Sequence, residues 1–150
     1  MIISPGSRNA PLVEAFTSDA YFQCYSIIDE RSAAFYALGI AQQNDKAAIL
    51  VCTSGSAALN YAAAIAEAYY QGVGLIVLTA DRPKRLIDQQ EGQSIRQENL
   101  FQNFVKASFN FPASIDRGTD FHYASRIINE ACVISERAQK GPVHINIPLE

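Results

Sequence analysis

The stretch AAILVCTSGSAALNYAAAIAEAYYQGVGLIVLT, residues 47–79, holds two apolar runs of strand character on either side of a helical pattern. The runs AAILVC and GLIVLT are continuous rather than alternating, which is typical of strands buried on both faces. The Ala-rich segment between them, residues 57–71, is long enough for a crossover helix, and Gly72 suits its end. A strand, a helix and a second strand in this order favour parallel pairing of the two strands.

The same alternation continues toward both ends of the chain. Three further apolar runs are expected as strands, at residues 1–4, 21–28 and 143–149, and three further helical patterns lie at residues 10–16, 30–43 and 123–138. This order predicts a doubly wound α/β fold, in which a mostly parallel sheet carries helices on both faces. The length of 150 residues suits a single domain, 1–150. Residues 82–103 are polar and aperiodic, which predicts a long loop.

Composition excludes several classes of function. A net charge of -3 provides no broad positive field, so we expect no nucleic-acid binding. No apolar run approaches the ~18 residues of a membrane span, and the first residues do not resemble a secretory signal, which predicts a soluble, cytoplasmic protein. The odd number of cysteines, Cys24, Cys52 and Cys132, and their apolar surroundings predict buried thiols rather than disulfides or a metal site.

Polar segments follow four of the predicted strands. They are SPGSR (4–8), DER (29–31), TSGSA (53–57) and TADRP (79–83). Because ligands bind beyond the carboxyl ends of the strands in an open parallel sheet, we expect these segments to share one functional edge. The side chains expected at this edge are Ser7, Arg8, Asp29, Glu30, Arg31, Thr53, Ser54, Asp81 and Arg82. Helix N-termini at the same edge offer free N–H groups.

Each of these residue types also has a purely structural use. Asp29 and Glu30 in a first helical turn complement the helix dipole. Ser54 suits a helix N-cap. Arg8 and Arg82 are either solvated or bind carboxylates through their forked donors. The residues alone leave both alternatives open.

Other catalytic patterns are absent or incomplete. The segment TSGSAA, residues 53–58, lacks the final glycine of a G-x-S-x-G nucleophile elbow. Neither His122 nor His144 falls at a strand end where it could serve Ser54 or Ser56, which argues against a serine hydrolase. His144 alternates with apolar residues, as a packed histidine in a strand does. The sequence contains no phosphate-binding glycine motif and no metal-ligand spacing.

Five segments occur in a fixed order and spacing: ISPGSRNAPL, DERSAAFYALGIA, CTSGSAALN, LTADRP and GQSIRQ. Together they resemble the amino-terminal pyrimidine-binding domain of the 2-succinyl-5-enolpyruvyl-6-hydroxy-3-cyclohexene-1-carboxylate synthase family, which are thiamine diphosphate enzymes of menaquinone biosynthesis. The resemblance runs from residue 2 to about residue 112, and residues 141–150 resemble the strand that ends this domain. SPGSR with TADRP is the specific pair, whereas DER-like acids and TSG loops alone indicate the wider superfamily.

The resemblance implies a catalytic role for Glu30. Its carboxyl group would bind N1′ of the aminopyrimidine of thiamine diphosphate and favour the imino form, which removes the thiazolium C2 proton. Thr53, Ser54 and Gly55 would lie on the cofactor side with it. The family's fold is the thiamine diphosphate-binding fold, in agreement with the doubly wound sheet expected from the pattern.

The resemblance further implies that Ser7, Arg8, Arg82 and Gln93 line the substrate side. Enzymes of this family are transferases that decarboxylate 2-oxoglutarate and add the succinyl unit to isochorismate. Both substrates are anionic, which gives the two arginines a purpose.

The same resemblance implies that this chain is one domain excised from a longer, three-domain enzyme. Family members hold the diphosphate and Mg²⁺ on a carboxy-terminal domain with a Gly-Asp-Gly motif, which this sequence lacks, so no metal ligand is expected here. We expect the fragment to be inactive alone and to self-associate into a homodimer or homotetramer. The alternatives are a pyrimidine-binding domain of an acetolactate-synthase-like enzyme and a noncatalytic α/β ligand-binding module.

Overall fold

The computed structural model describes residues 1–137 and 139–149. Ala138 and Glu150, which end two of the segments considered above, lie outside the described residues. Within the described part, the strands are β1 (Ile2–Ile3), β2 (Tyr25–Ser26), β3 (Ala48–Cys52), β4 (Leu75–Asp81), β5 (Ala107–Asn110) and β6 (Pro142–Pro148). The helices are α1 (Ala10–Thr17), α2 (Glu30–Asn44), α3 (Ser56–Leu59), α4 (Ala62–Gln71) and α5 (Gly118–Glu136), with short 3₁₀ turns η1 (Lys84–Leu86) and η2 (Gln102–Phe104).

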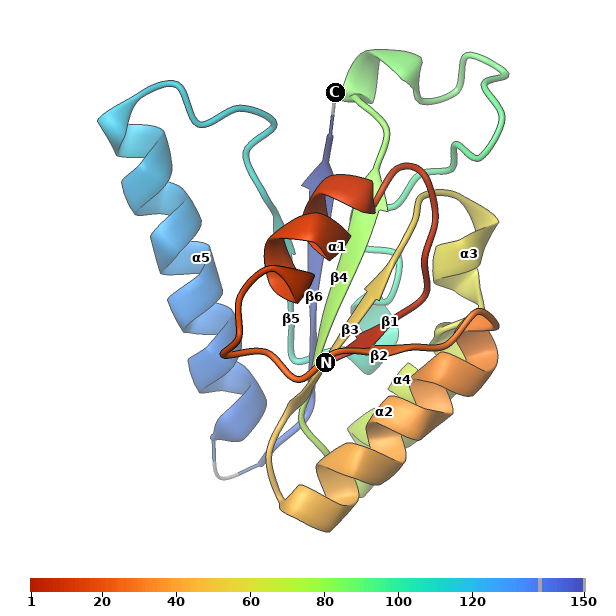
Figure 1. Ribbon diagram of the computed structural model, residues 1–150, viewed down its shortest axis with the longest axis vertical. Coiled ribbons are helices and arrows are strands. Elements are labelled where there is room, and N and C mark those ends of the chain that lie inside the picture. Colours follow the sequence, from red (N-terminus) through yellow and green to blue (C-terminus); the bar gives the residue numbers. More distant parts are fainter. Residues whose placement is uncertain (138, 150) are drawn as a thin grey trace.

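The strands form one sheet in the order β2-β1-β3-β4-β6-β5. Every pairing between them is parallel, and the longest runs along all of β4 and β6, from Leu75 opposite Pro142 to Asp81 opposite Pro148. The two strands lie side by side at the centre of Figure 1. The predicted doubly wound sheet is therefore confirmed, and it is wholly parallel where the structure describes it.

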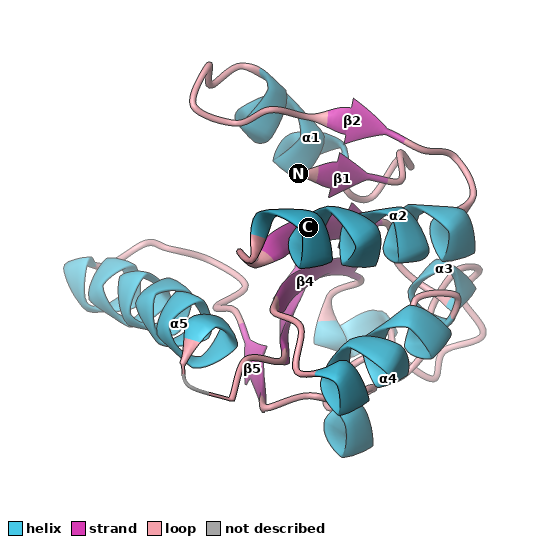
Figure 2. Ribbon diagram, turned by 90° about the horizontal axis from the view of Figure 1, so that it is seen from below, coloured by secondary structure: helices cyan, strands magenta, loops and turns pink. Residues whose placement is uncertain are grey.

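Helices cover both faces of this sheet. Small residues of α2 and α4, such as Ala33, Ala37 and Ala64, pack in one apolar cluster against Leu50 and Val77. A second cluster on the other face joins α1 and α5 to the outward sides of the same strands. Figure 2 shows α4 and α5 on opposite sides of the sheet. The longest helix of the described residues is α5, with 19 residues, and no helix there is both long and apolar enough to cross a membrane.

The predicted helix 57–71 is broken into α3 and α4 at Asn60. The side-chain amide of Asn60 donates to the Ser56 carbonyl at 3.2 Å, and its backbone N–H bonds Ala57 instead. An asparagine that takes the i-4 carbonyl with its own side chain competes with the helix. The next residue, Tyr61, is fully buried, and its hydroxyl bonds the Val51 carbonyl at 2.9 Å.

Three other sequence expectations differ from the structure. The predicted strand 21–28 is reduced to Tyr25–Ser26, and the strand β5 was not predicted. Of the thiols expected to be buried, Cys52 is buried and Cys24 is partly buried. The expectation was wrong for Cys132, which is exposed because it lies on the outer face of α5, one residue after the buried Ala131.

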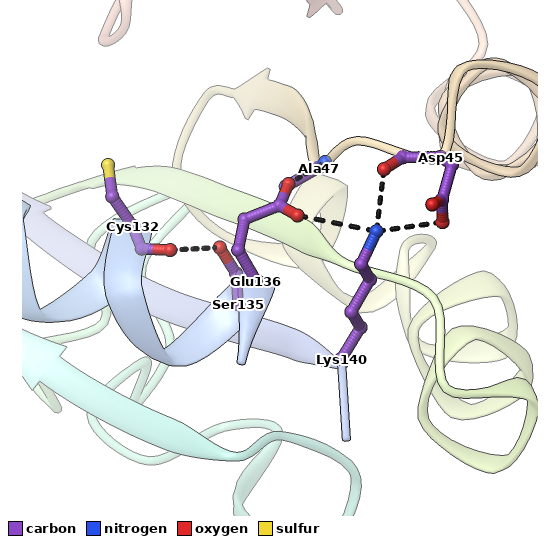
Figure 3. A network of polar contacts seen from close by, with 6 residues as sticks. All are labelled: Asp45, Ala47, Cys132, Ser135, Glu136 and Lys140. Atoms are coloured by element: carbon purple, nitrogen blue, oxygen red, sulfur yellow. Dashed lines mark hydrogen bonds and ion pairs between the residues drawn. The ribbon is translucent and has the colours of Figure 1, made fainter. Parts of the chain in front are cut away.

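At the amino-terminal edge of the sheet, Lys140 joins three elements (Figure 3). Its ammonium bonds the carbonyl and the carboxylate of Asp45, at 2.6 and 2.7 Å, where α2 ends in a left-handed residue. It also contacts Glu136 of α5 at 3.5 Å. Glu136 in turn accepts from the backbone N–H of Ala47, just before β3. This edge is opposite to the one that carries the candidate site.

Candidate functional site

The predicted site residues follow the carboxyl ends of their strands. Because the sheet is parallel, those ends lie at one edge, as the sequence analysis expected. Ser7 and Arg8 follow β1, Glu30 follows β2 as the first residue of α2, Thr53, Ser54 and Gly55 follow β3, and Arg82 follows β4. Gln93 comes from the polar loop 82–103, whose loop character was predicted.

The loop after β1 contacts both the loop after β3 and the end of β6. A Cβ placed on Gly6 would lie 2.5 Å from the Thr53 Cβ, so the glycine permits a close approach of the two loops. Arg8 reaches across the edge, and its Nη1 donates to the Leu149 carbonyl at 3.0 Å. The Leu149 N–H bonds the Asp81 carbonyl at 3.0 Å, which places Arg8 beside the end of β4 as well.

Asp29 and Glu30 have different surroundings. Asp29 is the N-cap of α2, because its carboxylate accepts from the Ser32 N–H at 2.7 Å, and the hydrogen bonds from Ser32 lower the pKa of Asp29. Of the two roles considered for Asp29, the structure therefore shows the capping of a helix. Glu30 is partly buried.

Two buried groups, Cys52 and Tyr61, lie close enough to Glu30 to feel its charge. Burial raises the pKa of both the Cys52 thiol and the Tyr61 hydroxyl, and the negative charge of Glu30 raises each further. Tyr61 also contacts the Ser4 hydroxyl at 3.1 Å. The thiol and the hydroxyl nearest to this charge in the described structure are therefore neutral.

The TSG turn after β3 is covered by the polar loop. Gly55 has φ +84, and a Cβ on it would lie 2.8 Å from the main chain of Gln93. The Ser54 hydroxyl donates to the Gln93 carbonyl at 3.0 Å. Ser54 is therefore not the N-cap of α3, since that position belongs to Gly55, which makes no side-chain cap bond. The turn needs a glycine both for its positive φ and for the close approach of the loop.

Arg82 lines a cleft of about 430 Å³ together with Asp81, Arg96, Gln97, Asn146 and Pro148. Its Nη2 donates to the Gly92 carbonyl at 3.0 Å. Its Nε is buried and, among the described residues, has no hydrogen-bond partner. A buried guanidinium donor without an acceptor is costly, and an arginine that lines a cleft is a suitable partner for a carboxylate.

A buried polar network, which the sequence analysis missed, joins the TSG turn to Arg82. The Gly55 N–H donates to Gln97 Oε1 at 2.7 Å, and Gln97 Nε2 donates to Asn146 Oδ1 at 3.0 Å. Asn146 Nδ2 donates to Asp81 Oδ2 at 2.8 Å, and Asp81 Oδ1 accepts from the Arg82 N–H at 2.8 Å. One signal could have revealed it: Asn146 interrupts the apolar run of the last strand.

Asp81 of this network and the nearby His144 have shifted pKa values. Burial raises the pKa of Asp81, although the hydrogen bonds from Asn146 and the Arg82 N–H oppose the shift. Burial lowers the pKa of His144 to about 4. The fully buried His144 contacts the Thr79 hydroxyl at 2.8 Å, so the prediction of a packed histidine is confirmed.

The side chains available for a metal ion are few. Among residues 1–137 and 139–149, no three His, Cys, Asp or Glu side chains are grouped as metal ligands would be. The polar groups at the carboxyl edge include the Glu30 carboxylate, Arg8 and Arg82, and the hydroxyl and main-chain groups of the TSG turn. Such a set suits hydrogen bonding to a neutral heterocycle and to anionic small molecules.

The family model and the curated proteins that this chain resembles agree with one another. Residues 1–103 match the family described as "Thiamine pyrophosphate enzyme, N-terminal TPP binding domain". Proteins named 2-succinyl-5-enolpyruvyl-6-hydroxy-3-cyclohexene-1-carboxylate synthase are 51% identical in Desulfotalea psychrophila and 53% identical in Flavobacterium johnsoniae, each over 100% of this chain. The relative in Porphyromonas gingivalis is 50% identical over 98% of the chain. The chain covers only 28, 26 and 26% of these relatives.

These matches confirm the resemblance that SPGSR and TADRP indicated. Thiamine pyrophosphate is the same cofactor as thiamine diphosphate. The chain belongs to the family of N-terminal thiamine pyrophosphate-binding domains of thiamine pyrophosphate enzymes.

Proposed function

We propose that this chain is the pyrimidine-binding domain of a synthase that decarboxylates 2-oxoglutarate and adds the succinyl unit to isochorismate. The observation that carries the proposal is the identity of 51% over the whole chain with a protein of that name. The arrangement of Glu30, Arg8 and Arg82 at one edge of the sheet supports it.

Glu30 is the proposed catalytic residue. When bound, thiamine diphosphate supplies a thiazolium carbon that stabilises carbanion character. Glu30 would bind ring atom N1′ of the aminopyrimidine and hold the proton there, and the neighbouring Cys52 and Tyr61 stay neutral. Thr53, Ser54 and Gly55 would form the adjoining wall of the cofactor site.

The diphosphate and Mg²⁺ are proposed to bind outside this chain. The chain spans about a quarter of the length of the relatives it matches. We therefore place the groups for the diphosphate and the metal on another domain of a longer, three-domain enzyme, which meets this domain across a subunit interface.

The substrate side is proposed to consist of Ser7, Arg8, Arg82 and Gln93. Both substrates carry carboxylates, which a guanidinium binds through paired N–H donors. Arg82 lines a cleft and has a buried Nε without a partner among the described residues, and Arg8 uses only its Nη1 in its contact with Leu149. These free donors are the physical support for carboxylate binding at this edge.

Self-association and a cytoplasmic location belong to the same proposal. Exposed apolar side chains lie on and beside the helices of one face of the sheet; they are Ile28, Phe35, Tyr36, Leu59 and Tyr70. An exposed patch of this kind favours assembly into a homodimer or homotetramer. The cysteines are unpaired, as is usual in a reducing compartment.

The test is a reaction with the full-length protein that carries this domain. The protein is expected to form product from 2-oxoglutarate and isochorismate when thiamine diphosphate and Mg²⁺ are added, whereas the 150-residue chain alone forms none. Pyruvate in place of 2-oxoglutarate is the control. Preferential use of pyruvate would point to an acetolactate-synthase-like enzyme, and no cofactor-dependent reaction with either would contradict the proposal.

A further inference from the structure

In the buried network between Gly55 and Arg82, the donor and the acceptor of each hydrogen bond are determined by their neighbours. Asp81, which is 4% exposed, accepts from Asn146 and from the Arg82 N–H. An ionised carboxylate can only accept, so the amide group of Asn146 must point its nitrogen at Asp81. The oxygen of Asn146 then faces the interior of the sheet edge, where it accepts from two donors.

Those two donors are the Thr79 hydroxyl, at 3.0 Å, and Gln97 Nε2, also at 3.0 Å. Because Gln97 must present its nitrogen to Asn146, its oxygen is left to face the Gly55 N–H. Gln97 Nε2 also donates to the Ala80 carbonyl at 3.0 Å, so both amide hydrogens are used. The charge of Asp81 thus determines the orientation of an amide that holds the TSG turn.

Gln97 belongs to the polar loop, yet it is only 1% exposed. Its side chain bonds the turn after β3, the end of β4 and the middle of β6, whereas its neighbours Arg96 and Glu98 are exposed. A loop residue with every polar atom satisfied inside the sheet edge is strongly fixed in place. Displacing it leaves the Gly55 N–H without a partner and removes one of the two donors to the Asn146 oxygen.

We propose that Gln97 is a positioning residue that fixes the cofactor-side turn, Ser54 and Gly55, relative to the substrate-side Arg82, through Asn146 and Asp81. The inference rests on the proposed function. It assigns a role to residues that touch neither cofactor nor substrate. Misplacing reacting groups by about 1 Å can cost about a hundredfold in rate, so a rigid link between the two halves of the site has catalytic value.

If Gln97 only stabilised the fold, its substitution would have a different effect. A residue that only stabilises the fold changes the unfolding midpoint but leaves the KM of correctly folded enzyme unaltered. A positioning residue changes KM and kcat/KM in the folded enzyme. The two roles separate when kinetics and thermal unfolding are measured on the same variants.

The experiment uses the full-length enzyme with four variants. Gln97→Met keeps the size of the side chain and removes every hydrogen bond, and Gln102→Met makes the same change at an exposed position of η2. Asn146→Asp replaces the donor to Asp81 with a second carboxylate. The double variant Asn146→Asp with Asp81→Asn reverses that hydrogen bond and restores it, with the acceptor for Gln97 preserved.

We expect Gln97→Met to raise KM for both thiamine diphosphate and 2-oxoglutarate about tenfold or more, and Gln102→Met to change neither. We expect Asn146→Asp to raise the KM for 2-oxoglutarate similarly at pH 8, and the double variant to recover most of the loss. A double variant as impaired as Asn146→Asp alone would overturn the proposal. If Gln97→Met fails to fold, the comparison of Asn146→Asp with the double variant still tests the proposal.

A second readout does not depend on the reaction. Amide hydrogen exchange at Gly55 and Arg82, measured on the folded full-length protein, reports the two ends of the network directly. Asn146→Asp is expected to speed exchange at both amides, and the double variant to restore protection. Restored protection in a protein without synthase activity would separate a failure of the proposed function from a failure of this inference. Unchanged exchange at Gly55 in Asn146→Asp would contradict the link.

Discussion

The neighbouring acids Asp29 and Glu30 allow a sharp test at the scale of one residue. Glu30→Gln in the full-length protein is expected to slow deuterium exchange at C2 of bound thiamine diphosphate by about 10²- to 10⁴-fold, because an amide cannot hold the proton at N1′. NMR of quenched samples measures the exchange. Asp29→Asn is the matched control, since asparagine caps a helix as well as aspartate does, and its exchange rate should stay close to that of the wild type.

His144 gives the protein a defined sensitivity to acid. Its pKa is 6.5 in the unfolded chain and about 4 in the folded protein, so the folded state binds fewer protons between these values. The stability conferred by the neutral ring is therefore complete above pH 6.5 and is lost as the pH falls toward 4, by about 3 kcal/mol in total. Unfolding in urea at pH 7 and pH 5 measures the loss.

His144→Gln is the variant that isolates this effect, because glutamine does not titrate yet can bond the Thr79 hydroxyl. Its stability should change less than that of the wild type between pH 7 and pH 5. The raised pKa of Asp81 acts in the opposite direction, with stability falling as the pH rises from 3.8, and it is common to both proteins. An equal acid response in the two proteins would show that the ring is protonated inside the fold.

The position of a single residue was predictable where it depends only on which strand the residue follows. Arg82 and Glu30 each come directly after a strand, and parallel strands bring such residues to one edge whatever the details of packing. Gln97 and Asn146 are 49 positions apart, and their contact exists only because the loop folds back over the sheet. Gln97 is one of several glutamines in a polar loop, so nothing in its local sequence distinguishes it.

At the scale of elements, hydrophobic patterning located the central strands and the long helices. The runs that became β3, β4 and β6 are mostly apolar, which is typical of strands covered on both faces. The two elements that were predicted wrongly or not at all have local explanations. Asn60 breaks a helix through its own side chain, and β5, with the sequence ASFN, is too short and too polar to stand out.

The Lys140 junction allows a test of how elements are held together. Lys140→Met should lower the thermal midpoint, because Asp45 and Glu136 lose a shared cation where α2, α5 and the start of β3 meet (Figure 3). The hydrogen bond that Lys140 donates to Asp45 raises the pKa of Lys140 above 10.5, so the contribution of the ammonium to stability is complete below pH 10.5 and disappears at higher pH. Differential scanning calorimetry measures the midpoint. Lys46→Met, at an exposed site on the same edge, should have a much smaller effect.

The whole molecule has apolar side chains on both outer surfaces, and their positions predict how copies associate. Ile28 is 82% exposed beside the Glu30 end of α2, whereas Phe121 is 62% exposed on α5, across the sheet. Sedimentation velocity of the isolated chain should show mass rising with concentration, and Ile28→Asp should shift it toward the monomer. Phe121→Asp is the control and should leave the association unchanged. An equal effect of both substitutions would assign the association to nonspecific contacts.

The sheet ends on one side at β2, which has only two residues, both exposed. A strand this short exposes too few unpaired backbone groups to template the addition of strands from other molecules. Growth of cross-β fibrils from this side is therefore disfavoured even where α2 leaves apolar side chains uncovered.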